Sequence, residues 1–129
     1  MRTVVFKYRE TVAWGMRVAL TASGSLSDRV SGLSGTVFRV DTATANVGGP
    51  ALDALHSGFR MMEDAFRRRH GDRGAEIMVH SVDFVVTDFQ DEAVTAAVIS
   101  WVVEEFDLEP VRVAVHYSRP TGRYEFEFG

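Results

Sequence analysis

Apolar and polar residues alternate along the first twenty positions, as they do in a strand with one buried face. Val4, Phe6 and Tyr8 alternate with more polar neighbours, and the same period continues at the even positions of residues 12–20. The pattern predicts two strands that meet around residues 9–11, or one long bent strand.

A stretch rich in small residues follows these strands. Residues 21–35 contain five serines and three glycines, which are typical of loops. We expect a flexible loop here, then a third strand over residues 36–40 and a turn-rich stretch that ends in Gly48-Gly49-Pro50.

Two later segments have the period of amphipathic helices. Pro50 suits the first turn of a helix, and Gly71 suits its end. The apolar residues between them recur at steps of three and four: Leu52, Leu55, Phe59, Met62 and Phe66. A second helix is predicted from a cap at Asp88 to about residues 106–107, with Pro110 beyond its end. Its buried stripe is predicted to hold Val94, Ala97, Val98, Trp101 and Val102.

The remaining apolar segments have the patterns of strands. Residues 76–86 and 111–117 predict two of them, and residues 118–122 predict a turn into a last strand over 124–128. Two helices with one apolar stripe each cover one face of one sheet most economically. We therefore predict a single α+β domain over residues 1–129, a two-layer α/β sandwich with the order β-β-β-α-β-α-β-β.

Composition and charge narrow the class of protein. The chain of 129 residues has no cysteine, which excludes disulfides, thiolate metal sites and a cysteine nucleophile. No stretch approaches the roughly 18 apolar residues that cross a bilayer, and the N-terminus lacks a signal-peptide pattern, so we expect a cytoplasmic protein. Residues 1–73 carry a net charge of +4 and residues 74–129 a net charge of −8. This asymmetry predicts either one basic and one acidic face, or two halves that fold together and cancel.

Two motifs in the first half of the chain carry a family resemblance. Residues 5–12 read VFKYRETV. This stretch is similar to the V-x-YRET-I strand that opens domain IV of elongation factor G-like translational GTPases. Gly48-Gly49-Pro50, with Ala54, Gly58 and Phe59 in the predicted helix, resembles the GG-x-IP…A-x-x-x-G start of that domain's helix.

Further motifs follow in the family's order. Residues 82–86 and Leu108-Glu109-Pro110 are similar to its V-x-D-V-x-V strand and its LEP junction, and Trp14-Gly15 resembles the tetracycline-resistance ribosomal-protection branch. The resemblance covers about residues 4–115. It implies a ribosomal protein S5 domain 2-like fold with a left-handed crossover, and a role in translation.

The chain departs from this family where the family reaches into the ribosomal decoding site. It has no GTPase domain and no G-x-x-x-x-G-K-S/T phosphate loop. Only residues 10–15 are available for the glycine-rich tip loop, and residues 87–92 lack the family's histidine. We therefore expect a stand-alone, non-enzymatic binding domain without tip function or cofactor, whose partner is RNA or a ribosomal surface.

Arginines gather at the predicted end of the first helix. As phosphate contacts we predict Arg60, Arg67, Arg68, Arg69 and Arg73. The alternative is that cations at a helix C-terminus simply complement the macrodipole. No aromatic residues interleave with these arginines, so the sequence does not predict base stacking.

A second hypothesis is a small-molecule-binding protein or small enzyme with a pocket between the exposed sheet face and a second subunit. The candidate pocket residues are Trp14, Met16, His80, Asp83 and His116. His80 and Asp83 are three apart on a predicted strand, so their side chains are expected on opposite faces. His56, Arg60 and Asp64 share a helix face and could hold an anion or form an ordinary ion pair. The short spacings of metal sites and the motifs of nucleophilic catalysis are missing, so neither metal ligands nor catalytic residues are predicted.

The predicted closing hairpin is rich in large aromatic residues: Tyr117, Tyr124, Phe126 and Phe128. Either they fold back onto the core or they pair with another subunit, because isolated hairpins are marginally stable and unprotected edge strands invite pairing. We favour a homodimer through this region. A purely structural oligomer is the remaining option.

Overall fold

The computed structural model describes residues 1–9, 15–33, 39–40, 49–84 and 91–129. It contains three helices and two separate sheets within these residues, which confirms the α+β class. The larger sheet has the strand order β1-β2-β4-β3. Its strands are β1 (Arg2–Arg9), β2 (Gly15–Ser27), β3 (Arg39–Val40) and β4 (Gly74–Phe84). β3 runs parallel to β4, and the other neighbouring strands are antiparallel.

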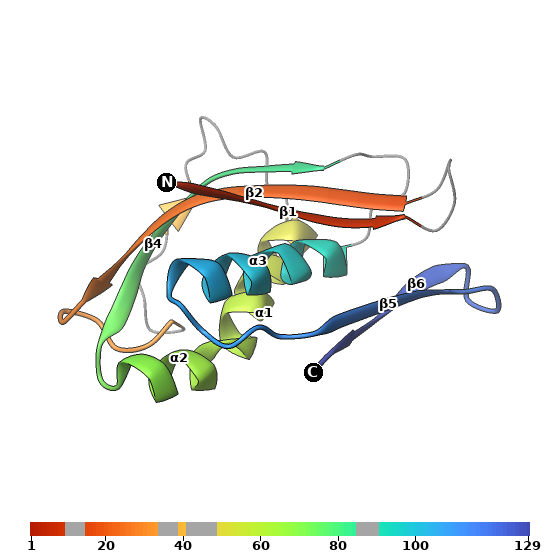
Figure 1. Ribbon diagram of the computed structural model, residues 1–129. Helices are drawn as coiled ribbons and strands as arrows, with labels where there is room; N and C mark the ends of the chain where they lie inside the picture. The colour runs from red at the N-terminus through yellow and green to blue at the C-terminus, as the bar shows by residue number, and fades with distance from the viewer. Residues whose placement is uncertain (10–14, 34–38, 41–48, 85–90) are drawn as a thin grey trace.

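The described helices lie on one side of this sheet (Figure 1). They are α1 (Gly49–Met61), α2 (Glu63–His70) and α3 (Asp91–Glu105). The single helix predicted from Pro50 to about residue 70 is thus divided at Met62, whose N–H is shared between the carbonyl oxygens of Gly58 and Phe59. The cap predicted at Asp88 lies outside the described residues. None of the described helices has the length and apolar character needed to cross a membrane.

β2 extends through a segment that was expected to be a flexible loop. Residues 21–27 pair with β4 as far as Ser27 opposite Gly74, so the loop prediction was wrong for these residues. Gly24 faces the helices, and a Cβ atom there would lie only 2.9 Å from Cη2 of Trp101. Glycine occurs at position 24 because the strand passes close to α3 there, and not because the chain turns.

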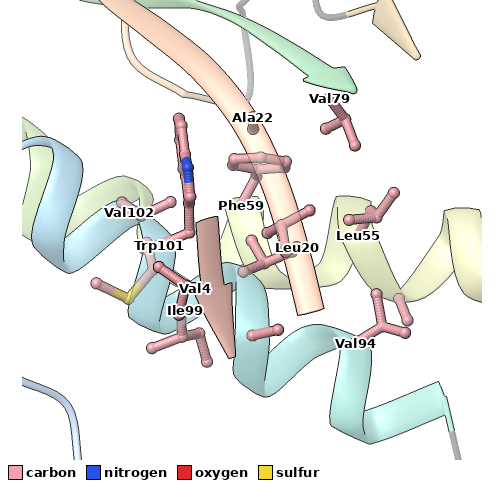
Figure 2. Close-up of a cluster of buried hydrophobic side chains, with 14 of the residues drawn as sticks. Val4, Leu20, Ala22, Leu55, Phe59, Val79, Val94, Ile99, Trp101 and Val102 are labelled. Atoms are coloured by element: carbon pink, nitrogen blue, oxygen red, sulfur yellow. The ribbon is translucent and has the colours of Figure 1, made fainter. Parts of the chain in front are cut away.

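The core fills the space between the sheet and the helices (Figure 2). The stripe predicted for α3 is buried as expected, but residues 93–99 are buried on every side of the helix, as in a central helix of a core. α1 meets α3 at Gly58, where an added Cβ would lie 2.6 Å from Cγ1 of Val98. The hydroxyl of Thr95 donates a hydrogen bond of 2.9 Å to the carbonyl oxygen of Ala54 in the same contact.

The closing hairpin forms a two-stranded sheet of its own, β5 (Val113–Ser118) and β6 (Arg123–Phe128). Its aromatic rings reach the inner face of β1: Tyr124 meets Tyr8 at 5.5 Å and Phe126 meets Phe6 at 6.1 Å between ring centroids. Tyr124 is buried, whereas Tyr117 is 41% exposed. These contacts correspond to the fold-back alternative. Pairing with a second copy stays a prediction.

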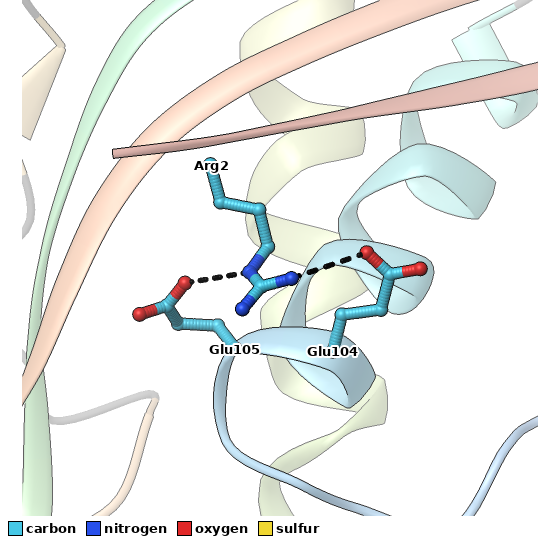
Figure 3. Close-up of polar contacts among 3 residues, drawn as sticks. All are labelled: Arg2, Glu104 and Glu105. Carbon is cyan, nitrogen blue, oxygen red and sulfur yellow. Dashed lines mark hydrogen bonds and ion pairs between the residues drawn. The ribbon is translucent and has the colours of Figure 1, made fainter.

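An ion-pair cluster ties the start of β1 to the end of α3 (Figure 3). Arg2 lies 2.9 Å from Glu105 and 3.7 Å from Glu104. Two carboxylates in the last turn of a helix oppose its macrodipole, and the last turn of α3 has no basic residue. Arg2 supplies the missing positive charge from a neighbouring strand.

Candidate functional site

Helix α2 carries three of the five predicted arginines, and all three are exposed. Phe66 is fully buried and anchors the helix, and the exposed Arg67, Arg68 and Arg69 follow it directly. Gly71 ends the helix with φ of 66°, and its N–H donates to the carbonyl oxygen of Arg67 at 2.8 Å. We call Arg60, Arg67, Arg68, Arg69 and Arg73 the α2 arginine cluster.

One member of the cluster has a structural role. Nε of Arg67 lies 2.7 Å from Oε1 of Glu63, one helical turn earlier. The other oxygen of Glu63 accepts a hydrogen bond of 2.6 Å from the N–H of Leu33. Arg67 therefore orients a carboxylate that holds the loop after β2 against α2, and we do not assign it to a ligand.

Two other members pair with very exposed carboxylates. Arg69 lies 3.3 Å from Asp107, and Arg73 lies 3.2 Å from Asp28. The side chains of these aspartates are 90% and 85% exposed. Ion pairs in this setting contribute little to stability because water screens the charges. Phosphate oxygens can replace such carboxylates at small cost.

Arg68 and Arg60 have no carboxylate partner among the residues that the structure describes. No ion pair or hydrogen bond joins the exposed Arg68 side chain to any other part of the described chain. Arg60 donates to Oγ of Ser57 at 3.2 Å, and within the described ranges no ion pair joins it to Asp64. The ion pair considered for the His56–Arg60–Asp64 row is thus not formed.

The alternative pocket residues are not brought to one place. Met16 is buried on the inner face of the sheet, whereas His80 and Asp83 lie on its outer face. His116 is on the hairpin, 2.8 Å from Glu125. Trp14 lies outside the described residues.

A β-bulge changes the geometry expected for β4. Ala22 pairs with Val79 and Thr21 pairs with Ser81, so His80 has no partner in the register. Buried Val79 and Val82 are therefore separated by two residues, and His80 and Asp83 lie on the same face. The prediction of opposite faces was wrong, because it assumed unbroken alternation. His80 is also brought to Ser23, with 2.6 Å between Nε2 and Oγ.

The sequence reasoning missed two cations on the outer face of the sheet. The register of β1 and β2 places Lys7 directly opposite Arg17, and both residues are exposed. Side chains at the odd positions of both strands point to the outer face of the sheet. Which of these residues stand opposite each other is fixed only by the length of the turn between the strands. The sequence alone could not give that register.

Comparison of the chain with protein-family models, with curated proteins and with solved structures found no match. The described residues also contain no group of three or more histidine, aspartate or glutamate side chains that could hold a metal ion. The functional argument therefore depends on the geometry of these surfaces.

Proposed function

We propose that this chain is a non-enzymatic binding domain that contacts RNA or a ribosomal surface through the α2 arginine cluster, in which Arg67 orients Glu63 and the other four arginines contact the ligand. The observation that carries the proposal is that Arg68 is exposed and unpaired in the described structure, while Arg69 and Arg73 pair only with exposed aspartates. Such guanidinium groups are available to phosphate oxygens. Arg60, which is exposed in the last turn of α1, is included as a further contact.

The resemblance to domain IV of translational GTPases supports the same partner class. We propose a ribosomal protein S5 domain 2-like fold. Strands β3 and β4 are parallel neighbours, and α1 and α2 come between them along the chain, which supports this fold. The proposal includes no decoding-site function, because residues 87–92 lack the family's histidine.

Co-sedimentation with purified ribosomes and with generic RNA tests this proposal. We expect pelleting at low salt that weakens at physiological salt and is lost in Arg68→Gln/Arg69→Gln. The matched control is Arg112→Gln/Arg119→Gln, which removes two exposed arginines from the hairpin region and leaves pelleting unchanged. No pelleting of the wild-type chain at any salt concentration would contradict the proposal.

The second candidate is a small-molecule-binding protein or small enzyme that uses the outer face of the sheet. The bulge in β4 favours it, because it brings His80 to Ser23 and onto the same face as Asp83. A ligand that raises the melting temperature of the wild-type chain, but not of His80→Gln, would support this candidate. Such a pocket would lie between the outer sheet face and a second subunit, and sedimentation velocity measures whether a dimer forms.

A further inference from the structure

Two positive charges face each other on the outer face of the sheet. Lys7 and Arg17 are a cross-strand pair of β1 and β2, and both side chains point away from the helices. Like charges directly opposite each other destabilise a pair of strands. Neither residue has an ion pair or hydrogen bond within the described chain. The fold therefore does not compensate this repulsion among its described residues.

The described surroundings leave this pair accessible. The described helices cover the other side of the sheet (Figure 1). The next row of the outer face holds Val5, which is 42% exposed, Ala19 and Asp83. Asp83 is the carboxylate nearest in the register, and no ion pair joins it to Arg17 within the described ranges.

A row of hydroxyl groups follows further along the strands. Thr3 pairs with Thr21, and their Oγ1 atoms are hydrogen-bonded at 2.8 Å. Ser81 continues this row on β4. Hydroxyl groups can donate to phosphate oxygens and exchange hydrogen bonds with a ribose 2′-hydroxyl.

We propose that Lys7 and Arg17 form a phosphate-binding pair that contacts the sugar–phosphate backbone of RNA. A phosphate bound between the two cations attracts both of them and offsets their mutual repulsion. Such a ligand would explain why two cations face each other at this position. The inference rests on the proposed function and adds a second contact surface to it. The hydroxyl row lies one row beyond Val5, Ala19 and Asp83, and it offers an RNA backbone hydrogen-bond partners that an apolar ligand could not use.

The first test measures the affinity for fluorescein-labelled oligouridylate by anisotropy between about 50 and 200 mM KCl. Each lost phosphate contact lowers the salt slope for a single strand by about 0.7, and the pair holds one phosphate, so Lys7→Gln/Arg17→Gln should lower the slope by about 0.7. The control Arg112→Gln/Arg119→Gln loses the same charge and should keep the wild-type slope. The test variant removes a repulsion, so we expect it to stay folded. An unchanged slope and affinity in this variant would overturn the inference.

The second test separates this inference from the proposed function. Inorganic tripolyphosphate, added to the 15N-labelled chain, should shift the amide signals of residues 5–9 and 15–19, but not in Lys7→Gln/Arg17→Gln. If RNA binding depended only on Arg68 and Arg69, and tripolyphosphate did not shift the amide signals of residues 5–9 and 15–19, the phosphate-binding role of Lys7 and Arg17 would be overturned. The proposed function would still stand. Shifts here without RNA binding by the wild-type chain would overturn both the proposed function and the RNA partner. Equal shifts with polyglutamate would also overturn the RNA partner, because the pair would then recognise any polyanion.

Discussion

At Gly24 the backbone of β2 comes so close to α3 that a methyl group has no room. An added Cβ would lie 2.9 Å from Cη2 of Trp101 and 3.1 Å from Cζ of Phe106. Both neighbours are buried aromatic rings in contact with each other, so they cannot move aside easily. We expect Gly24→Ala to lower the free energy of unfolding by about 1–3 kcal/mol, measured by urea denaturation. Ser25→Ala, on the other face of β2, is the control and should change it by less than about 0.5 kcal/mol.

Lys7 presents the opposite case, a residue that lowers stability. Replacing it by glutamate places a negative charge opposite Arg17. We expect Lys7→Glu to raise the free energy of unfolding by about 0.2–1 kcal/mol and to weaken RNA binding. A substitution that stabilises the fold often lowers activity or binding when it removes a residue of a functional site. A variant that gains stability and binds RNA as tightly as the wild-type chain would contradict this role.

At the scale of the elements, the contact between α1 and α3 depends on the absence of a side chain at Gly58. Alanine is favoured over glycine in a helix by about 1 kcal/mol. An added Cβ, however, would lie 2.7 Å from Cβ and 2.6 Å from Cγ1 of Val98, and a branched side chain in a helix cannot rotate away. We expect the clash to win, so that Gly58→Ala lowers the free energy of unfolding by about 1–3 kcal/mol.

A double-mutant cycle checks the cause of that loss. Val98→Ala removes Cγ1, the nearest atom that Gly58→Ala would meet, and keeps Cβ, so the double variant should lose less stability than the two single losses together. Strict additivity would mean that the two helices do not meet as described.

The sequence predicted elements well where the period was strong. The apolar steps of three and four in the first helix, the stripe of α3 and the alternation in the closing hairpin all correspond to observed elements. The predictions failed where a tertiary contact overrides local preference. Residues 21–27 form a strand because they pair with β4, and position 24 is glycine because Trp101 leaves no space for a side chain. The bulge at His80 breaks an alternation that the sequence gives no reason to break.

At the scale of the whole molecule, the hairpin is held by aromatic contacts with β1 and not by a ladder to the larger sheet. Tyr124 is buried between Tyr8 and Tyr117. We expect Tyr124→Ala to lower the free energy of unfolding by about 3 kcal/mol. Tyr117→Ala loses mainly one aromatic pair and should cost about 1 kcal/mol. Equal losses in urea denaturation would show that the hairpin is not packed on β1.

The charge asymmetry of the sequence is partly cancelled by the fold. Arg2 of the basic half pairs with Glu104 and Glu105, and Arg69 pairs with Asp107. The sequence identified the α2 arginines as a group, but it could not separate Arg67, which holds Glu63, from Arg68, which is exposed. It could not find Lys7 with Arg17 either, because that pair depends on strand register.

The central claim is that the basic surfaces of this domain bind RNA through phosphate contacts. The most direct measurement is the dependence of its RNA affinity on salt concentration. The account predicts that the logarithm of the association constant falls linearly with the logarithm of the salt concentration, with a slope of about −0.7 for each phosphate contact. An affinity that does not change with salt, or the absence of RNA binding at low salt, would contradict it.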